Sequence, residues 1–201
     1  RIGVLVAGNG ASDDAAKEAL TNIAMQIAAM NPQYISRDEI SADELAKMKE
    51  ITIDSALNDP FSLPKPVLSK LIEKAVAGVW SAEDVAIYEE KKSNMNFLPN
   101  FLSKEAKAQL AEIACADKEE ISGNKIFSGL VEGRISKQMK EICLLDQGYV
   151  KAEDGKQTVA AYLKSVNPAL KIAKFVRFEV GEGMEKKNED FAAEVAKQMN
   201  V

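Results

Sequence analysis

The side chains that most often carry out enzyme chemistry are absent or scattered in this chain. Histidine does not occur among the 201 residues, which removes the most common general base, the most common metal ligand and every triad built on imidazole. The two cysteines, Cys115 and Cys143, and the acidic residues have no spacing typical of zinc or calcium sites. We therefore expect no enzyme, no cofactor and no metal site.

One glycine motif and three acidic pairs are candidates for a binding site, but each has a simpler structural explanation. Gly8-Asn9-Gly10 lies between a strand-like and a helix-like run, but it lacks the lysine of a P-loop and the third glycine of a dinucleotide-binding loop. It therefore predicts a plain turn. The acidic pairs lie at predicted helix starts or on solvated faces, where negative charge is common; they are Asp13-Asp14, Asp38-Glu39 and Glu89-Glu90.

Composition narrows the classes of partner. The net charge is −5 and the pI is about 5.1, which argues against direct binding of nucleic acid, because duplex binding depends on Lys and Arg neutralising phosphates. No apolar run approaches the roughly 20 residues of a membrane span, and no signal-peptide pattern is present. Two cysteines suit a reducing compartment. We expect a cytoplasmic protein with free thiols and no membrane contact.

The two ends of the chain predict one sheet. Arg1–Ala7 reads as a strand, and residues 174–180 alternate with a period of two, as a half-buried antiparallel strand requires. In the second run Val176, Phe178 and Val180 share one face, and Phe175, Arg177 and Glu179 share the other. We expect the two runs to pair in a small antiparallel sheet of about three strands, with the third strand near residues 144–150.

Helical patterns fill the chain between these strands. Ser12 is a candidate N-cap for a helix that ends at Asn31-Pro32. Ser41 and Glu44 fit a capping box that opens a helix over Ala42–Leu57. The apolar stripe of this helix contains Leu45, Met48, either Ile51 or Thr52, and Ser55, and its antiparallel mate spans Lys125–Leu144 with Ile126, Leu130, Ile135, Met139 and Ile142.

A separate group of short helices is predicted between these two long ones. They span Val67–Ala77, Ser81–Lys91 and Ser103–Ala116. Trp80, Phe97 and Phe101 lie in or beside the joints, and we expect these rings to be buried as local core. The predicted class is α+β: a small sheet with packed helices, a projecting antiparallel coiled coil and an inserted all-helical subdomain.

This architecture divides the chain into four predicted parts. Residues 1–41 and 145–183 would form a core subdomain with the sheet, and residues 42–57 and 124–144 the coiled coil. Residues 58–123 would be the inserted subdomain, and residues 184–201 a C-terminal helical module whose apolar face either folds back or docks on another molecule.

Four stretches of the sequence resemble the C-terminal half of bacterial elongation factor Ts. They are RIGVLVAG at 1–8, NIAMQIAAMNPQYISRDEIS at 22–41, LVEGRISKQMKEICLLDQGYV with KQTVAAYLK at 130–164, and FVRFEVGEGMEKKNEDFAAEVA at 175–196. The resemblance implies a non-enzymatic nucleotide-exchange factor that binds elongation factor Tu. It implies that the C-terminal module docks on Tu, with Met184, Phe191 and Val195 as candidate contact residues; the alternative is that Phe191 and Val195 pack on their own subdomain.

Two departures from the family pattern matter. The Thr-Asp-Phe motif that the family uses near the Tu nucleotide site is not in this sequence, since Asp190-Phe191 follows Glu189. We therefore interpret the chain as part of a longer factor that binds Tu without full exchange activity. Residues 58–123 also stand where the family usually has a short connection. A competing hypothesis is a self-association module, in which an exposed sheet pairs two copies.

Overall fold

The computed structural model describes residues 1–184, which form two compact units. One unit contains residues 1–31 together with residues 161–184, and the other contains Pro32–Ala160. The class is α+β, as predicted from the sequence. The division of the chain into four parts stays a prediction.

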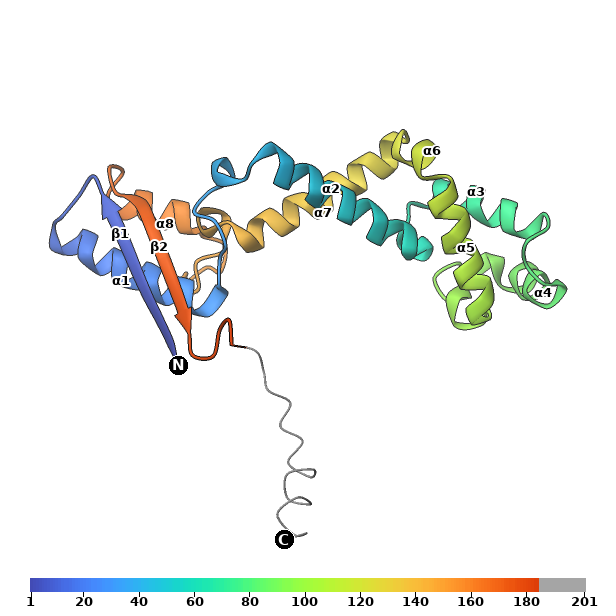
Figure 1. The fold of residues 1–201 in the computed structure, drawn as a ribbon, viewed down its shortest axis with the longest axis horizontal. Helices are drawn as coiled ribbons and strands as arrows, with labels where there is room; N and C mark the ends of the chain where they lie inside the picture. Colours follow the sequence, from blue (N-terminus) through green and yellow to red (C-terminus); the bar gives the residue numbers. More distant parts are fainter. Residues whose placement is uncertain (185–201) are drawn as a thin grey trace, which may run out of the picture. The chain divides into compact units, whose positions relative to one another are not determined.

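The first unit is built on the predicted pairing of the two distant strands. Strand β1 (Ile2–Asn9) pairs antiparallel with β2 (Lys171–Glu179), and the two arrows lie side by side in Figure 1. Val4 lies opposite Arg177, and Val6 lies opposite Phe175. Helix α1 (Asp14–Met30) packs on β1, and helix α8 (Val159–Val166) leads toward β2.

The sheet has two strands in the described part of the chain, not about three. Residues near 144–150 instead form the short 3-10 helix η5 (Leu144–Asp146). The backbone N–H groups of Leu144 and Leu145 donate to the carbonyls of Tyr34 and Ile35 in a short parallel bridge. With these groups already paired and the chain turning immediately, no third strand forms.

Helix α1 is fixed by its N-cap, by its buried face and by a close approach to β1. The carboxylate of Asp13, and not Ser12 as predicted, accepts from the N–H of Ala16 and caps the helix. Its buried face consists of Ala16, Ala19, Ile23 and Ile27, together with Gln26. A Cβ at Gly8 would lie 2.8 Å from a Leu20 methyl carbon, so glycine at this position lets helix and strand approach closely.

The second unit contains the predicted helical pair. Helix α2 (Ala42–Asn58) packs against α7 (Lys125–Ile142), and the two run in opposite directions (Figure 1). The Ser41 hydroxyl accepts from the Glu44 N–H as predicted, whereas the Glu44 carboxylate accepts from the Tyr34 hydroxyl. Thr52 is buried and Ile51 is exposed, which resolves the alternative that the sequence left open.

The predicted apolar stripe of helix α7 is confirmed in part. Met139 is buried as predicted, and Leu130 and Ile135 pack partly buried against the core, but Ile126 is exposed. Phe127 and Val131, which the predicted stripe did not include, are buried instead. The reason is that Phe127 and Val131 join the core of the inserted helices as well as facing α2. A Cβ at Gly129 or Gly133 would meet no atom within 4 Å, so no close helix contact explains these two glycines.

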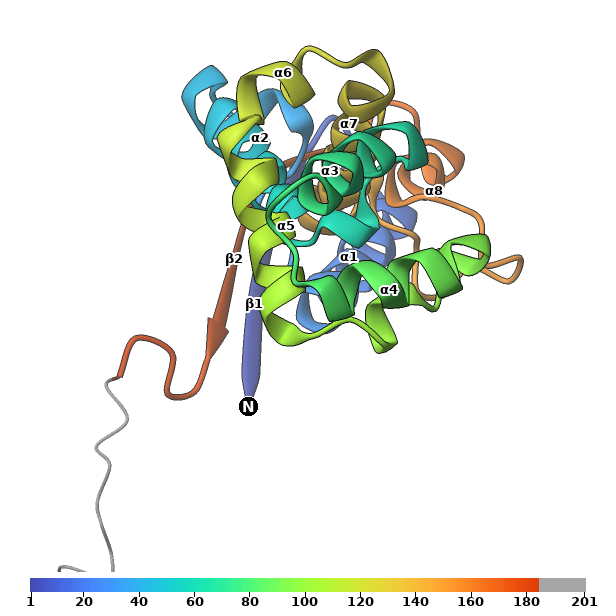
Figure 2. The same ribbon diagram turned by 90° about the vertical axis from the view of Figure 1, so that its right-hand side faces the viewer.

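The helices between α2 and α7 pack around one apolar core, to which α2 and α7 also contribute (Figure 2). We keep the name inserted subdomain for these helices, and their standing as a separate part stays a prediction. They are α3 (Lys65–Val76), α4 (Ala82–Lys91), α5 (Lys104–Ala116) and the short α6 (Lys118–Ser122). The three helices predicted from the sequence are confirmed. The apolar side chains of their common core include Leu57, Leu63, Leu68, Leu71, Ile72, Trp80, Leu98, Leu102, Leu110, Ile121 and Phe127.

The aromatic residues of this subdomain divide into two kinds. Trp80 is buried as predicted, donates from Nε1 to the carbonyl of Ala106 at 2.9 Å, and meets Tyr88 edge-on. Phe97 and Phe101, which were predicted to be core, are exposed. Leu98 and Leu102, one residue further along in each case, fill the core instead.

The cysteines and the lengths of the helices bear on the predictions of free thiols and of no membrane span. Both cysteines are free thiols; Cys115 is exposed, and Cys143 is buried, which raises the pKa of its thiol. None of the helices in residues 1–184 combines the length and the apolarity needed to cross a lipid bilayer.

Candidate partner-binding surface

The two faces of the sheet differ in what covers them. Directly paired residues of an antiparallel sheet lie on the same face, so Val4, Val6, Arg177 and Phe175 share one face. These residues are all partly buried. The opposite face carries Leu5, Val176 and Phe178, and Val180 continues the alternation beyond the strand. We call this second set the open sheet face.

The open sheet face is the more exposed of the two, although most of its side chains are apolar. Leu5 is 67% exposed, Phe178 58% and Val180 77%. Large apolar side chains that cluster in water mark contact surfaces more often than isolated ones do. If contacts within this unit were the only ones these side chains make, burial would be favoured over exposure.

Arg177 shows that the sheet is held in this register. Its side chain is only 11% exposed, and Nη1 contacts Glu179 Oε2 at 3.0 Å. Its Nε is buried without a hydrogen-bond partner in the described chain, which is unfavourable. A slip of one residue would turn Arg177 out and Phe178 in. In the observed register Arg177 is covered and Phe178 is exposed. The open sheet face is therefore available for an external contact.

Of the three predicted contact residues, Met184 lies among the described residues. Met184 is 75% exposed and follows a turn in which Val180 N–H donates to the Arg1 carbonyl and Met184 N–H donates to the Gly181 carbonyl. Phe191 and Val195 lie outside the described residues. Met184 was predicted from the sequence and stays a prediction as a contact residue. The open sheet face was not predicted, although the alternation of β2 contained the signal.

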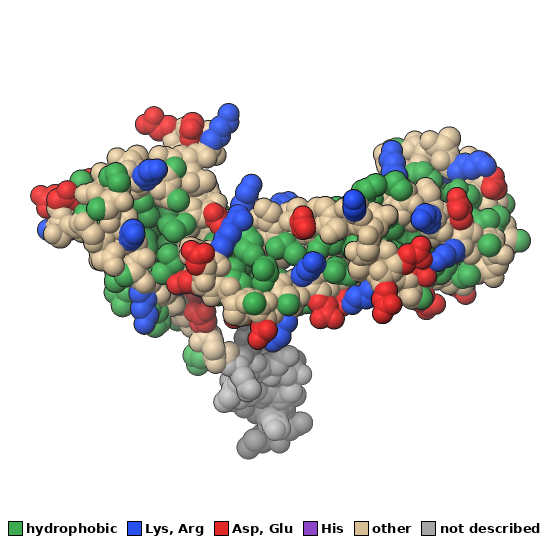
Figure 3. Space-filling view, turned by 90° about the horizontal axis from the view of Figure 1, so that it is seen from above, with side chains coloured by type: hydrophobic (Ala, Val, Ile, Leu, Met, Phe, Trp, Pro, Cys, Tyr) green, Lys and Arg blue, Asp and Glu red, His purple; other side chains and the backbone are tan. Residues whose placement is uncertain are grey.

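A second apolar surface lies on the helical pair. A groove of about 360 Å³ opens between α2, α7 and the chain before α2. Figure 3 shows hydrophobic side chains reaching the surface among charged ones along α2 and α7. Tyr34 closes one side, and its hydrogen bond to Glu44 raises the pKa of the phenol. The other lining residues are Gln33, Lys47, Met48, Ile51, Gln138, Glu141 and Ile142.

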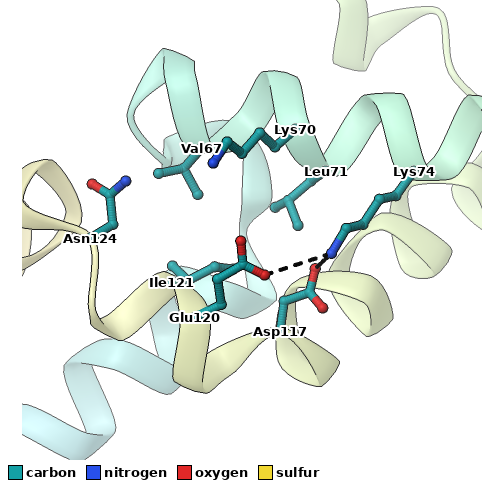
Figure 4. Close-up of a pocket in the computed structure, with 8 residues that line it drawn as sticks. All are labelled: Val67, Lys70, Leu71, Lys74, Asp117, Glu120, Ile121 and Asn124. Atoms are coloured by element: carbon teal, nitrogen blue, oxygen red, sulfur yellow. Dashed lines mark hydrogen bonds and ion pairs between the residues drawn. The ribbon is translucent and has the colours of Figure 1, made fainter.

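The cleft between α3 and α6 has a structural explanation (Figure 4). Lys74 forms an ion pair with Asp117 and lies 3.9 Å from Glu120, and the hydrogen bond to Asp117 raises the pKa of the amine. The enclosed space is about 40 Å³, enough for one or two water molecules. Within residues 1–184, no three His, Cys, Asp or Glu side chains gather as a metal site requires.

Comparison with known proteins identifies the family. Elongation factor Ts of Clostridioides difficile is 34% identical, over 99% of this chain and 46% of the relative's length. The protein of that name from Alkaliphilus metalliredigens is 35% identical, over 99% of this chain and 67% of its own length. The chain thus spans less than half the length of the first relative. The elongation factor Ts family model matches residues 1–182, and the chain therefore belongs to the elongation factor Ts family.

Proposed function

We propose that this chain binds elongation factor Tu and takes part in the exchange of its GDP for GTP in the cytoplasm, by contact and without covalent chemistry. The single observation that carries the proposal is the family match over residues 1–182. The open sheet face adds physical support, because it offers an exposed apolar surface of the kind that protein partners cover.

The mechanism follows from linkage. A partner changes the nucleotide affinity of Tu only if it binds the nucleotide-free state more tightly than the nucleotide-bound state. The Thr-Asp-Phe motif is absent from the 201 residues, so the interaction that the family makes near the nucleotide is missing. We propose that this chain supplies docking free energy and that full exchange activity needs residues outside it.

The contact residues proposed for Tu are Met184, Phe191 and Val195. The double variant Phe191→Ala/Val195→Ala should bind nucleotide-free Tu at least about tenfold more weakly, a loss of about 1.4 kcal/mol, because two apolar anchors are truncated. Isothermal titration calorimetry measures the change. Met30→Ala, which truncates an exposed methionine of α1, is the control and should bind normally. Equal affinity of the double variant would show that these side chains are not the anchors.

Self-association is the second candidate function, and the open sheet face is the observation that favours it. Two copies pairing through this face would remove Leu5 and Phe178 from water. Sedimentation velocity at tens of micromolar should then show a dimer that Leu5→Lys/Phe178→Lys converts to monomer. Ile126→Lys, at an exposed isoleucine of α7, is the control. A monomer at all concentrations would eliminate this candidate.

The two candidates are separable in one further experiment. If a dimer covers the surface that Tu uses, adding Tu should convert dimer to a one-to-one complex, and the lysine variants should lose both associations. If the variants remain monomeric and still bind Tu, the open sheet face serves self-association alone.

A further inference from the structure

The inserted subdomain has a surface that its own packing does not explain. Its core is complete without Phe97 and Phe101, which are 57% and 52% exposed. A half-exposed ring forgoes part of the free energy that its full burial would give. Exposed aromatic side chains on a well-packed domain are typical anchors of protein interfaces.

The two rings are held on a fixed turn. The 3-10 helix η4 (Leu98–Asn100) lies between them, and Leu98 and Leu102 anchor it in the core. The N–H of Phe101 donates to the Leu98 carbonyl at 3.0 Å, and the Lys107 amine donates to the Pro99 carbonyl at 3.1 Å. Because the backbone is already ordered, binding through the rings would lose little further conformational entropy.

A polar groove is lined in part by Asn96, the residue that precedes Phe97 in the chain. Its volume is about 190 Å³, and Leu68 forms a buried apolar part of its wall. The remaining lining residues are Lys65, Ser69, Ser93, Asn94, Met95 and Asn96. Lys65 is the only charged lining residue, and its amine forms no ion pair within the described chain. An uncompensated ammonium among hydroxyl and carboxamide donors is complementary to a carboxylate.

We propose that Phe97, Phe101 and the Lys65 groove form a docking surface for a protein segment that carries an aspartate or glutamate next to an apolar side chain. The carboxylate pairs with Lys65, and the apolar side chain packs on the exposed rings. This surface is separate from Met184, Phe191 and Val195, so its occupant does not depend on the proposed binding of Tu.

The charges around the rings favour a protein over single-stranded nucleic acid. Lys91 lies 5.0 Å from the centre of the Phe101 ring, but its amine pairs with Glu90 at 2.7 Å. Lys92 pairs with Glu89 at 2.6 Å. Nucleic-acid grooves combine aromatic rings with several free cations that follow the phosphates, whereas Lys91 and Lys92 are each paired with a carboxylate.

The test begins with peptide selection on the whole 201-residue chain. A library of random displayed peptides should enrich sequences with Asp or Glu beside Leu, Ile or Phe. Fluorescence polarisation of a labelled synthetic peptide from that set then measures affinity. Phe97→Ala/Phe101→Ala and Lys65→Glu should each weaken binding at least tenfold. Lys70→Glu makes the same charge change on α3 at a residue that does not line the groove, and it should leave affinity within twofold.

A second measurement does not depend on any variant of the protein. Replacing the acidic residue of the peptide with its amide should weaken binding to the unmodified chain at least tenfold. The proposal fails if no acidic-apolar peptides are enriched or if the amide peptide binds equally. It also fails if a labelled oligouridylate, and not the acidic peptide, loses binding in the Phe97→Ala/Phe101→Ala variant.

Discussion

Gly10→Ala is expected to destabilise the first unit by about 3 kcal/mol or more. Gly10 has φ of +88°, a region in which a side chain is strained by about 1–3 kcal/mol. A Cβ at this position would also lie 1.8 Å from the carbonyl oxygen of Ala169. The contact is with backbone, which no rotamer change can relieve, so the turn after β1 or the chain before β2 must move.

A matched control separates the clash from the strain. Gly181 has φ of +90°, and a Cβ there would meet no atom within 4 Å. Urea unfolding of the two variants, followed by backbone amide NMR signals of β1 and β2, should show Gly181→Ala to be clearly milder. Equal losses would contradict the close approach of Gly10 to Ala169.

Asp84→Ala is expected to lower the free energy of unfolding of the second unit by about 3 kcal/mol. Asp84 is 6% exposed, and its carboxylate accepts from the Ser103 N–H at 3.0 Å, the Ser103 hydroxyl at 2.8 Å and the Ser81 hydroxyl at 2.9 Å. Ser81 and Ser103 are the N-caps of α4 and α5. Removing a charged acceptor strands these donors, at a cost of about 1–3 kcal/mol for each buried group.

Glu83→Ala is the control because Glu83 lies in the same first turn of α4 but is exposed. It removes the same charge from the helix N-terminus without removing the buried hydrogen bonds. Thermal unfolding followed by circular dichroism, with the fluorescence of Trp80 as a local probe, should rank the Asp84 variant well below it. Similar melting of both variants would show that the carboxylate does not join the two helices.

The same residue predicts an acid dependence. Hydrogen bonds from Ser103 lower the pKa of Asp84 below its usual value, so the carboxylate stabilises the fold above an unfolded-state pKa of about 3.9. That stabilisation is lost as the pH falls through the lowered folded-state pKa. Asp84→Ala should therefore lose less stability than the unmodified chain over this acidic range.

The architecture was largely predictable from local patterns. The alternation of residues 174–180 and the apolar run at the start of the chain were sufficient to predict the pairing of β1 and β2. Ser41, Ser81 and Ser103 marked the starts of three helices, and the structure shows each hydroxyl accepting from a backbone N–H. Such signals act over a few residues and can therefore be read without the tertiary structure.

What could not be predicted is which face a residue shows to its neighbours. An alternating strand has two faces, and nothing local says that Phe178 is exposed while Arg177 is covered. Burial of Phe97 and Phe101 was the ordinary expectation for large rings. The turn around Leu98 is irregular, so the spacing of its residues does not show which side chains are buried. Only the tertiary structure shows that Leu98 and Leu102 are buried there and that Phe97 and Phe101 are not.

Part of the candidate partner-binding surface could be proposed from the sequence, and part could be found only in the structure. The resemblance to elongation factor Ts led to the prediction of Met184, Phe191 and Val195 as contact residues. Met184 is exposed, but all three remain predictions. The open sheet face and the Lys65 groove arise from residues distant in the sequence, so both required the pairing of strands and the packing of helices.

The most direct test is calorimetric titration of this chain into nucleotide-free elongation factor Tu. The account predicts saturable binding with one-to-one stoichiometry, showing that the chain carries docking free energy without the Thr-Asp-Phe motif. Absence of binding by a chain that circular dichroism shows to be folded would contradict it, because the surfaces proposed here would then not suffice to hold Tu.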